Sequence, residues 1–340
     1  MNFTQSFIDH ERILHSIKTA FAVLIGFIIT KFIHLPVDQW LIITIIVVMC
    51  AQVNVGSVLQ KSYMRFLGTL AGSICAILTL QFANKDPVII AIVISLSAMI
   101  FSYIATSKAI FAEAGTLGAT TVVIILIAQN PSLPSALGRF FEITMGLVIA
   151  ALASQFIFPI HARALLRRLQ AKNFQQIALY YQTIFLKEPS AENNKFCMEL
   201  DEKISASLTN QRKLATDAAR EPIGKKFHHK KFITSLNCSR EIFRSIIFMH
   251  YAKDYSNETK KILSNETFKQ FHEKIFSILN EISVHFGEKN FPAIELPALS
   301  SLQGIIHSTK NLSREDVLHI DGFLFCAEVL LDRLQVLQKI

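Results

Sequence analysis

Six long apolar stretches fill the first 160 residues of the chain. A run of about 18–20 mainly apolar residues is long enough to cross a bilayer as a helix. The stretches cover roughly 14–33, 39–56, 64–82, 87–106, 109–129 and 140–159. Turn-forming residues separate them, at His34 to Pro36, Gly56 to Lys61, Asn84 to Pro87, Ser107 to Lys108, and Asn130 to Pro134. The pattern predicts an all-α domain with six transmembrane helices over residues 1–160, whose first helix remains as an anchor.

The composition changes sharply after Pro159. Of the 34 Lys and Arg residues only 8 precede residue 161, and of the 26 Asp and Glu residues only 6 do. From there the apolar residues recur with the spacing of amphipathic helices. Helices are expected at roughly 161–187, 191–219, 229–253, 258–285, 298–310 and 314–339. The chain therefore divides into a transmembrane domain, 1–160, and a helical bundle, 161–340.

Charges beside the apolar stretches predict the orientation, because Lys and Arg accumulate on the cytoplasmic side of membranes. An inside N-terminus places most of the basic residues near the membrane in the cytoplasm, namely Arg12, Lys18, Lys61, Arg65, Lys108, Arg163, Arg167, Arg168 and Lys172. The other side then receives only Lys31, Lys85 and Arg139. Both termini and the bundle are expected to be cytoplasmic.

A short motif occurs twice among the apolar stretches. Arg65-Phe66 and Arg139-Phe140 lie 74 residues apart, and each pair stands at the start of the last stretch of a group of three. Two copies with an odd number of crossings face opposite ways, so the spacing predicts a 3+3 inverted repeat, in which a polar site forms between the halves. Chance, or packing constraints shared by membrane helices, would also produce so short a match.

Small residues follow each arginine at intervals of one helical turn. Gly68 and Gly72 follow Arg65, and Gly146 follows Arg139. Such residues let helix backbones approach closely in lipid, where van der Waals contact drives association. Helix packing by itself explains these glycines. It does not explain the arginines.

Two interpretations of Arg65 and Arg139 remain. A charge near the membrane centre is costly, so it faces protein or water, or its long side chain reaches the headgroups. At a tight helix junction the two arginines would attract an anion from opposite sides. Near the stretch ends they would instead be interfacial anchors. Anchoring is also the interpretation of four lysines, Lys18, Lys31, Lys61 and Lys85.

Other polar residues extend the candidate pathway. Glu142 follows Arg139 by three residues and shares its helix face, so we expect it to hold the guanidinium or to relay protons. Glu113 lies near the start of the fifth stretch, and Thr69, Thr116 and Thr120 supply hydroxyls. The hydroxyls of Thr116 and Thr120 in the fifth stretch either line a route or donate to backbone carbonyls of their own helix.

Several classes of function lack their sequence signals. We find no G-x-x-x-x-G-K-[ST] phosphate loop, no H-E-x-x-H spacing and no CxxC among the five cysteines. No nucleophile and base share a compact segment. Basic and acidic residues interleave in the second half, which argues against nucleic-acid binding. We therefore expect no cofactor, no metal, no enzymatic activity and no transport driven by ATP through this chain alone.

The order of these features resembles the aromatic acid exporter superfamily, which includes fusaric-acid-resistance-type proteins and, more distantly, plant aluminium-activated malate transporters. The resemblance rests on three features of the membrane domain: Trp40 opening the second span, R-x-x-G-T-x-x-G opening the third from Arg65, and R-x-x-E-x-x-x-G opening the sixth from Arg139. Phe158-Pro159 at the end of the sixth span and Glu221-Pro222 within the helical domain complete it.

This resemblance implies a multi-pass protein of the bacterial inner membrane that exports organic or aromatic carboxylates. It also implies that a periplasmic adaptor protein is a partner of some members. Many such exporters carry the membrane and bundle unit twice, whereas this chain carries it once, so a homodimer is expected. The alternatives are a passive anion channel and a non-transporting membrane-anchored scaffold that recruits partners through its bundle.

Overall fold

The computed structural model describes residues 3–33, 39–82, 86–107, 110–128, 132–222, 227–263, 265–285, 295–299 and 313–339. These residues are helical wherever they have regular secondary structure, as predicted. They form two compact units. The N-terminal unit comprises Met1–Ala162 with Arg220–Gly224, and the C-terminal unit comprises Arg163–Ala219 with Lys225–Ile340. A single division of the chain after residue 160 does not describe these units, because Arg220–Gly224 belongs to the N-terminal unit.

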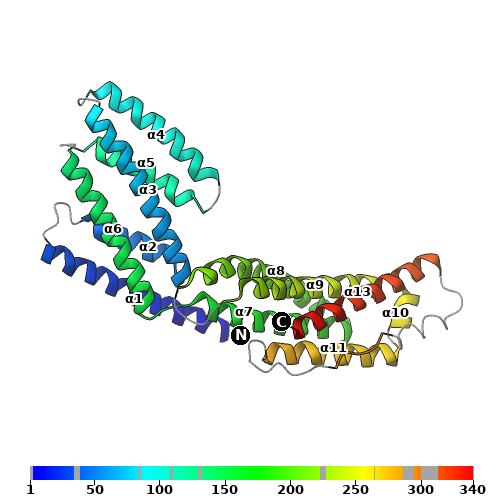
Figure 1. The fold of residues 1–340 in the computed structure, drawn as a ribbon. Helices are drawn as coiled ribbons and strands as arrows, with labels where there is room; N and C mark the ends of the chain where they lie inside the picture. Colours follow the sequence, from blue (N-terminus) through cyan, green and yellow to red (C-terminus); the bar gives the residue numbers. More distant parts are fainter. Residues whose placement is uncertain are drawn as a thin grey trace. The chain divides into compact units, whose positions relative to one another are not determined.

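The N-terminal unit contains six helices among its described residues (Figure 1). They are α1 (Phe3–Ile33), α2 (Gln39–Ala51), α3 (Val55–Phe82), α4 (Pro87–Ser107), α5 (Ala112–Leu126) and α6 (Leu133–Phe156). Each corresponds to one predicted stretch. Four of them are long and apolar enough to cross a membrane, over Glu11–Phe32, Val55–Phe82, Pro87–Ser107 and Leu133–Phe156.

The other two helices are shorter than the predicted spans. α2 has 13 residues and α5 has 15, below the roughly 17–25 residues that a spanning helix needs. By length, therefore, four of the six predicted spans qualify, and α2 and α5 do not. Each short helix is the middle one of its group of three.

The predicted break between the second and third stretches is misplaced. The chain leaves helical structure at Gln52 to Asn54 rather than at Gly56 to Lys61. The carbonyl of Asn54 accepts hydrogen bonds from the Val58 amide at 3.0 Å and the Ser57 hydroxyl at 2.9 Å, so α3 begins nine residues earlier than expected. The polar residues between Gly56 and Ser62 are part of α3, because the backbone amides and carbonyls there bond to one another within the helix. The other predicted breaks include residues outside the described ranges.

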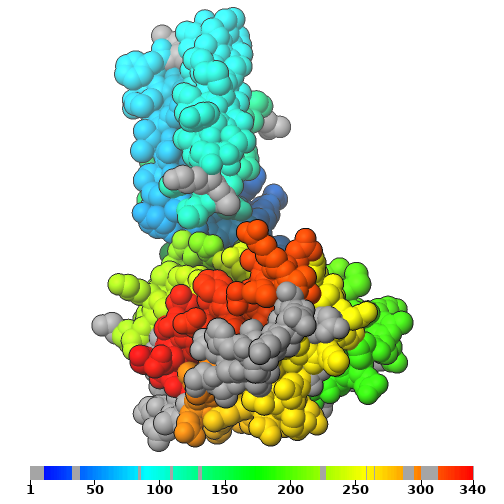
Figure 2. Space-filling view, turned by 90° about the vertical axis from the view of Figure 1, so that its right-hand side faces the viewer, coloured from blue at the N-terminus to red at the C-terminus, as the bar shows by residue number. Residues whose placement is uncertain are grey.

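The six helices pack in two interlocked groups. α3 packs against both α5 and α6, α2 packs against α6, and the outer helices α1 and α4 pack against α2 and α5 respectively (Figure 1). The outer surface is apolar: α4 buries only Ser97 among its described side chains and leaves Ile92, Met99 and Tyr103 exposed. The surface of α4 is the cyan part of Figure 2. Such a surface suits contact with lipid tails.

The C-terminal unit is a helical bundle. Its described helices are α7 (Ala162–Phe185), α8 (Ala191–Arg220), α9 (His229–Lys253), α10 (Asn257–Leu263), α11 (Glu266–His285) and α13 (Arg314–Gln338). The predicted helix 258–285 is two helices, since the carbonyl of Asn265 accepts the Lys269 amide at the start of α11, and asparagine favours such N-terminal positions. The predicted helix 298–310 lies almost wholly outside the described residues.

An aromatic cluster forms the centre of the bundle core. His272 is 2% exposed, stacks on Phe185 with ring centroids 4.3 Å apart, and lies 2.6 Å by Nδ1 from the Tyr181 hydroxyl. Phe268 and Phe323 pack around it. Burial lowers the pKa of His272 to about 3, with a smaller contribution from the charge of Lys253. The ring is therefore neutral in the folded bundle at ordinary pH.

The buried histidine predicts that acid destabilises the bundle. In the unfolded chain His272 titrates near its ordinary pKa of 6.5, whereas the folded group stays neutral down to about pH 3. Between these values the unfolded state binds more protons, so the free energy of unfolding falls as the pH falls, by up to about 1.4 kcal/mol per pH unit. Thermal unfolding of the full chain in detergent, followed by circular dichroism across this window, measures the effect.

The matched control is an exposed histidine at the start of α9. His272→Phe keeps an aromatic ring in the core and should flatten the acid dependence, while His229→Phe should leave it unchanged. An equal dependence in the wild type and His272→Phe would show that other groups govern the acid response.

Candidate functional site

A polar stripe runs along α3 inside the N-terminal unit. Ser62, Arg65, Thr69 and Ser73 recur at intervals of three or four residues, which places them on one helix face, and all four are buried. The hydroxyls of Ser62, Thr69 and Ser73 have no hydrogen-bond partner among the described residues. Buried polar groups normally have a protein or water partner, so this face is suited to contact water or a polar solute.

Arg65 belongs to an ionic cluster where α3 meets the first turn of α5. Its Nη1 lies 3.5 Å from one carboxylate oxygen of Glu113, and Lys61 Nζ lies 2.7 Å from the other. Two cations thus share one carboxylate. The exposed fractions of their side chains are 10% for Arg65 and 12% for Lys61, so Lys61 is largely buried in an ion pair rather than an exposed anchor.

Arg139 lies in the corresponding position of α6. Its Nη1 donates to the carbonyl oxygen of Ile124 at 3.2 Å, and its guanidinium carbon lies 5.7 Å from the ring centroid of Trp40, in the first turn of α2. These two contacts join the guanidinium to α5 and α2, and the pairing of Arg139 with Glu142 remains a prediction. Trp40 therefore makes a cation–π contact with Arg139, a role separate from the interfacial one expected for it.

Glu142 is fully buried in α6. A carboxylate in an apolar interior is costly unless it is neutralised or well hydrogen-bonded. Its position one turn after Arg139 places it among helices rather than at their outer surface. Glu113, in contrast, has 33% of its side chain exposed.

Both arginines keep an unsatisfied donor. The Nε atoms of Arg65 and Arg139 are buried and have no hydrogen-bond partner among the described residues. A guanidinium donates through five N–H groups and accepts none, so each site retains donor capacity that an oxygen of an anion or of water would satisfy.

The glycine that follows Arg65 by seven residues makes a backbone contact with α5. A Cβ atom on Gly72 would lie 2.5 Å from the carbonyl oxygen of Gly118 and 2.9 Å from Cβ of Thr121. Real Cβ atoms do not approach backbone so closely, so only glycine permits this packing distance. Gly68 meets the backbone of Ala114 in the same way.

The glycine that follows Arg139 by seven residues makes the corresponding contact with α2. A Cβ atom on Gly146 would lie 2.7 Å from the carbonyl oxygen of Leu41 and 2.9 Å from Cβ of Thr44. In both cases the glycine meets a carbonyl and a threonine three residues later, on the middle helix of the opposite group of three. The α3–α5 and α6–α2 contacts therefore share one geometry.

The residues that follow the two arginines touch each other. The rings of Phe66 and Phe140 have centroids 5.8 Å apart, and they occupy the same position of the repeated motif. When two copies of a unit are related by a two-fold axis, equivalent residues contact one another only close to that axis. The contact therefore marks where such an axis would pass, between α3 and α6.

Two predicted pathway hydroxyls have another role. Thr116 and Thr120 are exposed on α5, and their Oγ1 atoms donate to the carbonyls of Ala112 and Thr116 at 2.8 and 2.7 Å. Of the two predicted roles, lining a route or bonding to their own helix, these hydroxyls have the second. Thr69 differs because it is 1% exposed and its hydroxyl has no such bond.

Sequence reasoning missed Lys18. It was expected to reach the headgroups, but its side chain is fully buried and Nζ has no hydrogen-bond partner among the described residues. Small residues follow it at one-turn intervals, Ala22 and Gly26, and both are buried. Ala22 and Gly26 are four residues apart, as are Gly68 and Gly72 after Arg65, so a related signal was present in the sequence. Lys31 is exposed as predicted, and Lys85 lies outside the described residues.

The part of the chain that the structure describes holds no group of three or more His, Cys, Asp or Glu residues close enough to bind a metal ion. The described residues of the N-terminal unit offer buried cations, buried hydroxyls and the buried carboxylates of Glu142 and Glu221. These groups bind anions, water or protons.

Two curated proteins show detectable similarity. The inner membrane protein YeeA of Escherichia coli (strain K12) is 24% identical over 216 residues, covering 62% of this chain and 59% of its own length. The aluminum-activated malate transporter 1 of Triticum aestivum is 24% identical over 239 residues, covering 63% of this chain and 52% of its own length. The chain thus spans little more than half the length of these relatives.

The sequence profile of the fusaric acid resistance protein family matches residues 12–221. The match covers α1 from Arg12 onward, all of α2 to α6, both arginine motifs, the first two helices of the bundle and Glu221. It includes more than half of the chain and every residue of the candidate site. The chain therefore belongs to the fusaric acid resistance protein family.

Proposed function

We propose that the protein is a membrane transporter of organic or aromatic carboxylate anions that acts without ATP hydrolysis of its own. The bundle and both termini would lie in the cytoplasm of a bacterial cell, and the N-terminal unit in the inner membrane. Two copies would form the working unit, and a periplasmic adaptor is a further expected partner.

One observation carries the proposal: an apolar unit buries cations that keep unused donors. Lys18 and Arg65 are buried and Arg139 is half-buried, and each has a buried nitrogen with no hydrogen-bond partner among the described residues. Intramembrane charges are expensive and mark substrate or ion pathways. A surplus of cationic donors favours an anionic substrate, and carboxylates satisfy guanidinium and ammonium groups well.

An inverted 3+3 repeat would explain why these groups occur in pairs. In this proposal α1–α3 and α4–α6 are equivalent, so that the α3–α5 contact at Gly72 corresponds to the α6–α2 contact at Gly146. The Phe66–Phe140 contact supports an axis between the halves. Arg65 and Arg139 would then each bind the carboxylate through a guanidinium, one near each face of the membrane.

The two short helices support the same location for the pathway. α2 and α5 occupy corresponding positions in the two groups, and unusually short segments at such positions point to the substrate site of transporters with inverted repeats. Arg139 lies over Trp40 at the start of α2, and Arg65 pairs with Glu113 at the start of α5. The substrate would pass between these helix starts.

The names of the relatives agree with the proposal. One is an inner membrane protein, and the other is a transporter whose name specifies malate, a dicarboxylate. Neither relative is covered over two thirds of its length, so the activity of this chain rests on its own residues.

Flux into vesicles tests the function. Protein reconstituted in liposomes should accumulate or release a labelled aromatic carboxylate, such as benzoate, faster than protein-free liposomes. A proton gradient that drives accumulation would indicate coupled transport. Flux that follows only the anion's own gradient and the membrane potential would indicate a channel.

The scaffold alternative makes the opposite prediction. Absence of flux for benzoate, malate and chloride in oriented vesicles, together with rescue of a deletion strain by the C-terminal unit on an unrelated transmembrane anchor, would overturn the transport proposal.

A further inference from the structure

A cavity in the bundle lies where the ends of α7 and α9 meet the start of α11. It has a volume of about 210 Å³ and is lined by Phe185, Leu186, Lys253, Leu263, Lys269, His272 and Glu273. All of these residues belong to the C-terminal unit. The volume is below the roughly 300–1,000 Å³ of pockets for drug-sized ligands, so a small molecule would fit.

The lining of this cavity combines apolar and cationic side chains. Phe185, Leu186 and Leu263 supply the apolar surface, whereas Lys253 and Lys269 supply two ammonium groups. A mainly apolar lining with a few charged groups is the usual composition of small-molecule sites. Glu273 is the single carboxylate of the lining and is exposed.

Lys253 keeps donor capacity after its protein contacts. Its Nζ donates to the carbonyl of Ile184 at 3.1 Å and lies 5.4 Å from the ring centroid of Phe185. An ammonium group has three donors, so two remain. Burial lowers the pKa of Lys253 from its ordinary value, and the nearby charge of Asp254 opposes this shift.

His272 forms a rigid part of the wall. Its ring is stacked on Phe185, and its Nδ1 contacts the Tyr181 hydroxyl. The arrangement with the fewest unsatisfied groups has the phenol donating to Nδ1, because Tyr181 has no other described partner for its proton. The proton of the neutral ring is then on Nε2, a donor without a hydrogen-bond partner among the described residues.

We propose that this cavity binds a small apolar carboxylate, with its carboxylate between Lys253 and Lys269 and its apolar part against Phe185 and Leu263. The charges of the lining sum to one net positive charge, which matches a monovalent anion better than a divalent one. The site would let the bundle sense the same chemical class of anion that the membrane unit is proposed to carry. Its existence does not depend on transport.

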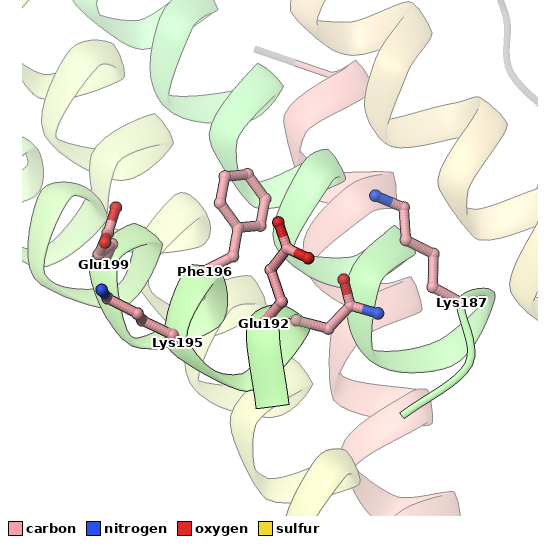
Figure 3. A pocket seen from close by; sticks show the side chains of 6 residues that line it. Lys187, Glu192, Lys195, Phe196 and Glu199 are labelled. Atoms are coloured by element: carbon pink, nitrogen blue, oxygen red, sulfur yellow. The ribbon is translucent and has the colours of Figure 1, made fainter. Parts of the chain in front are cut away.

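A second, larger pocket of the same unit lacks these properties. It has a volume of about 440 Å³ and is lined by Lys187, Glu192, Asn193, Lys195, Phe196 and Glu199. Figure 3 shows side chains of both charges around it. Its two lysines are balanced by two glutamates, so it offers no net charge to an anion. It supplies a control site on the same bundle.

Hydrogen–deuterium exchange of the full-length protein in detergent tests the proposal, because it reports the location of binding. Benzoate and acetate, at up to roughly 10 mM to detect a millimolar Kd, should slow exchange in peptides from the end of α9 and the start of α11. Inorganic sulfate serves as the divalent comparison and should protect these peptides less.

Three variants and one control define the site. Lys253→Met keeps the packing of the stem, and His272→Phe keeps the stacked ring; each should raise the apparent Kd about tenfold. Glu273→Gln removes the carboxylate of the lining and should lower it. Lys195→Met, in the larger pocket, should leave it unchanged.

Two results would overturn the inference. The first is no local protection by either carboxylate in the wild type, whose folding circular dichroism verifies. The second is protection that Lys253→Met and Lys195→Met reduce equally, which would indicate a general charge effect. Vesicle flux is measured separately, so absence of transport with local protection retained would refute only the proposed function.

Discussion

The Arg65→Gln and Arg139→Gln variants are each expected to transport a labelled aromatic carboxylate roughly 10- to 100-fold more slowly than the wild type. Hydrogen bonds to charged groups contribute about 1.5–3 kcal/mol, and about 1.4 kcal/mol corresponds to tenfold. Glutamine keeps polarity and much of the length but removes the positive charge. Initial rates of uptake into liposomes with equal amounts of inserted protein measure the loss.

The two variants should behave alike, because their positions are equivalent in the proposed repeat. Uptake and efflux measured in the same vesicles would show whether each arginine limits entry from its own side. Arg65→Lys, which retains a charge, should recover part of the rate. Unchanged flux in both glutamine variants would remove the arginines from the pathway.

The control is a hydroxyl on the same unit that bonds to its own helix. Thr116→Val removes the exposed Oγ1 that donates to Ala112 and should change the rate by no more than about twofold, as expected for a surface substitution. Thr69→Val, at a buried hydroxyl of the α3 stripe, should slow it more. If Thr116→Val and Thr69→Val changed the transport rate equally, burial of the hydroxyl within the unit would not determine its effect.

The Gly72→Ala and Gly146→Ala variants should each destabilise the N-terminal unit by about 1–3 kcal/mol, the usual cost of overpacking. In both cases the new methyl group would meet a backbone carbonyl at less than 3 Å, which cannot rotate away as a flexible side chain can. Leucine at either position should prevent recovery of monodisperse protein. Thermal unfolding in detergent, followed by the fluorescence of Trp40, reports on this unit because Trp40 is the sole tryptophan.

Gly322 provides the matched control. It lies in α13, and a Cβ atom there would meet nothing within 4 Å. Gly322→Ala should therefore be tolerated and gain up to about 1 kcal/mol from helix propensity. If Gly72→Ala were as stable as Gly322→Ala, the close α3–α5 approach would not be required.

Much of the helical organisation could be predicted because its signals are local. Long apolar runs indicated the six helices of the N-terminal unit, and amphipathic spacing indicated α7, α8, α9 and α13 to within a few residues. Ends were less accurate. α2 stops at Ala51 and α3 starts at Val55 because backbone and side-chain bonds at Asn54 decide the break, and hydropathy does not contain that information.

The candidate site was predicted only in part, for a related reason. The repeated motif identified Arg65, Arg139 and the glycines that follow them, since a charged residue followed by small residues at helical spacing is a pattern of the sequence itself. Burial of Lys18, the partnership of Arg139 with Trp40 and the inward position of Thr69 depend on which helices pack together. Residues of one helix have fixed spacing, but their partners come from elsewhere in the chain.

By itself, the sequence determined where helices form and which of their residues are small, charged or apolar, because run length and periodicity act within a few turns of backbone. Only the tertiary structure decided which cations are buried, which glycines meet a carbonyl, and that Phe66 meets Phe140. These contacts join residues far apart in the sequence, such as Gly72 with Gly118, Gly146 with Leu41 and Phe66 with Phe140. They form only when the helices pack.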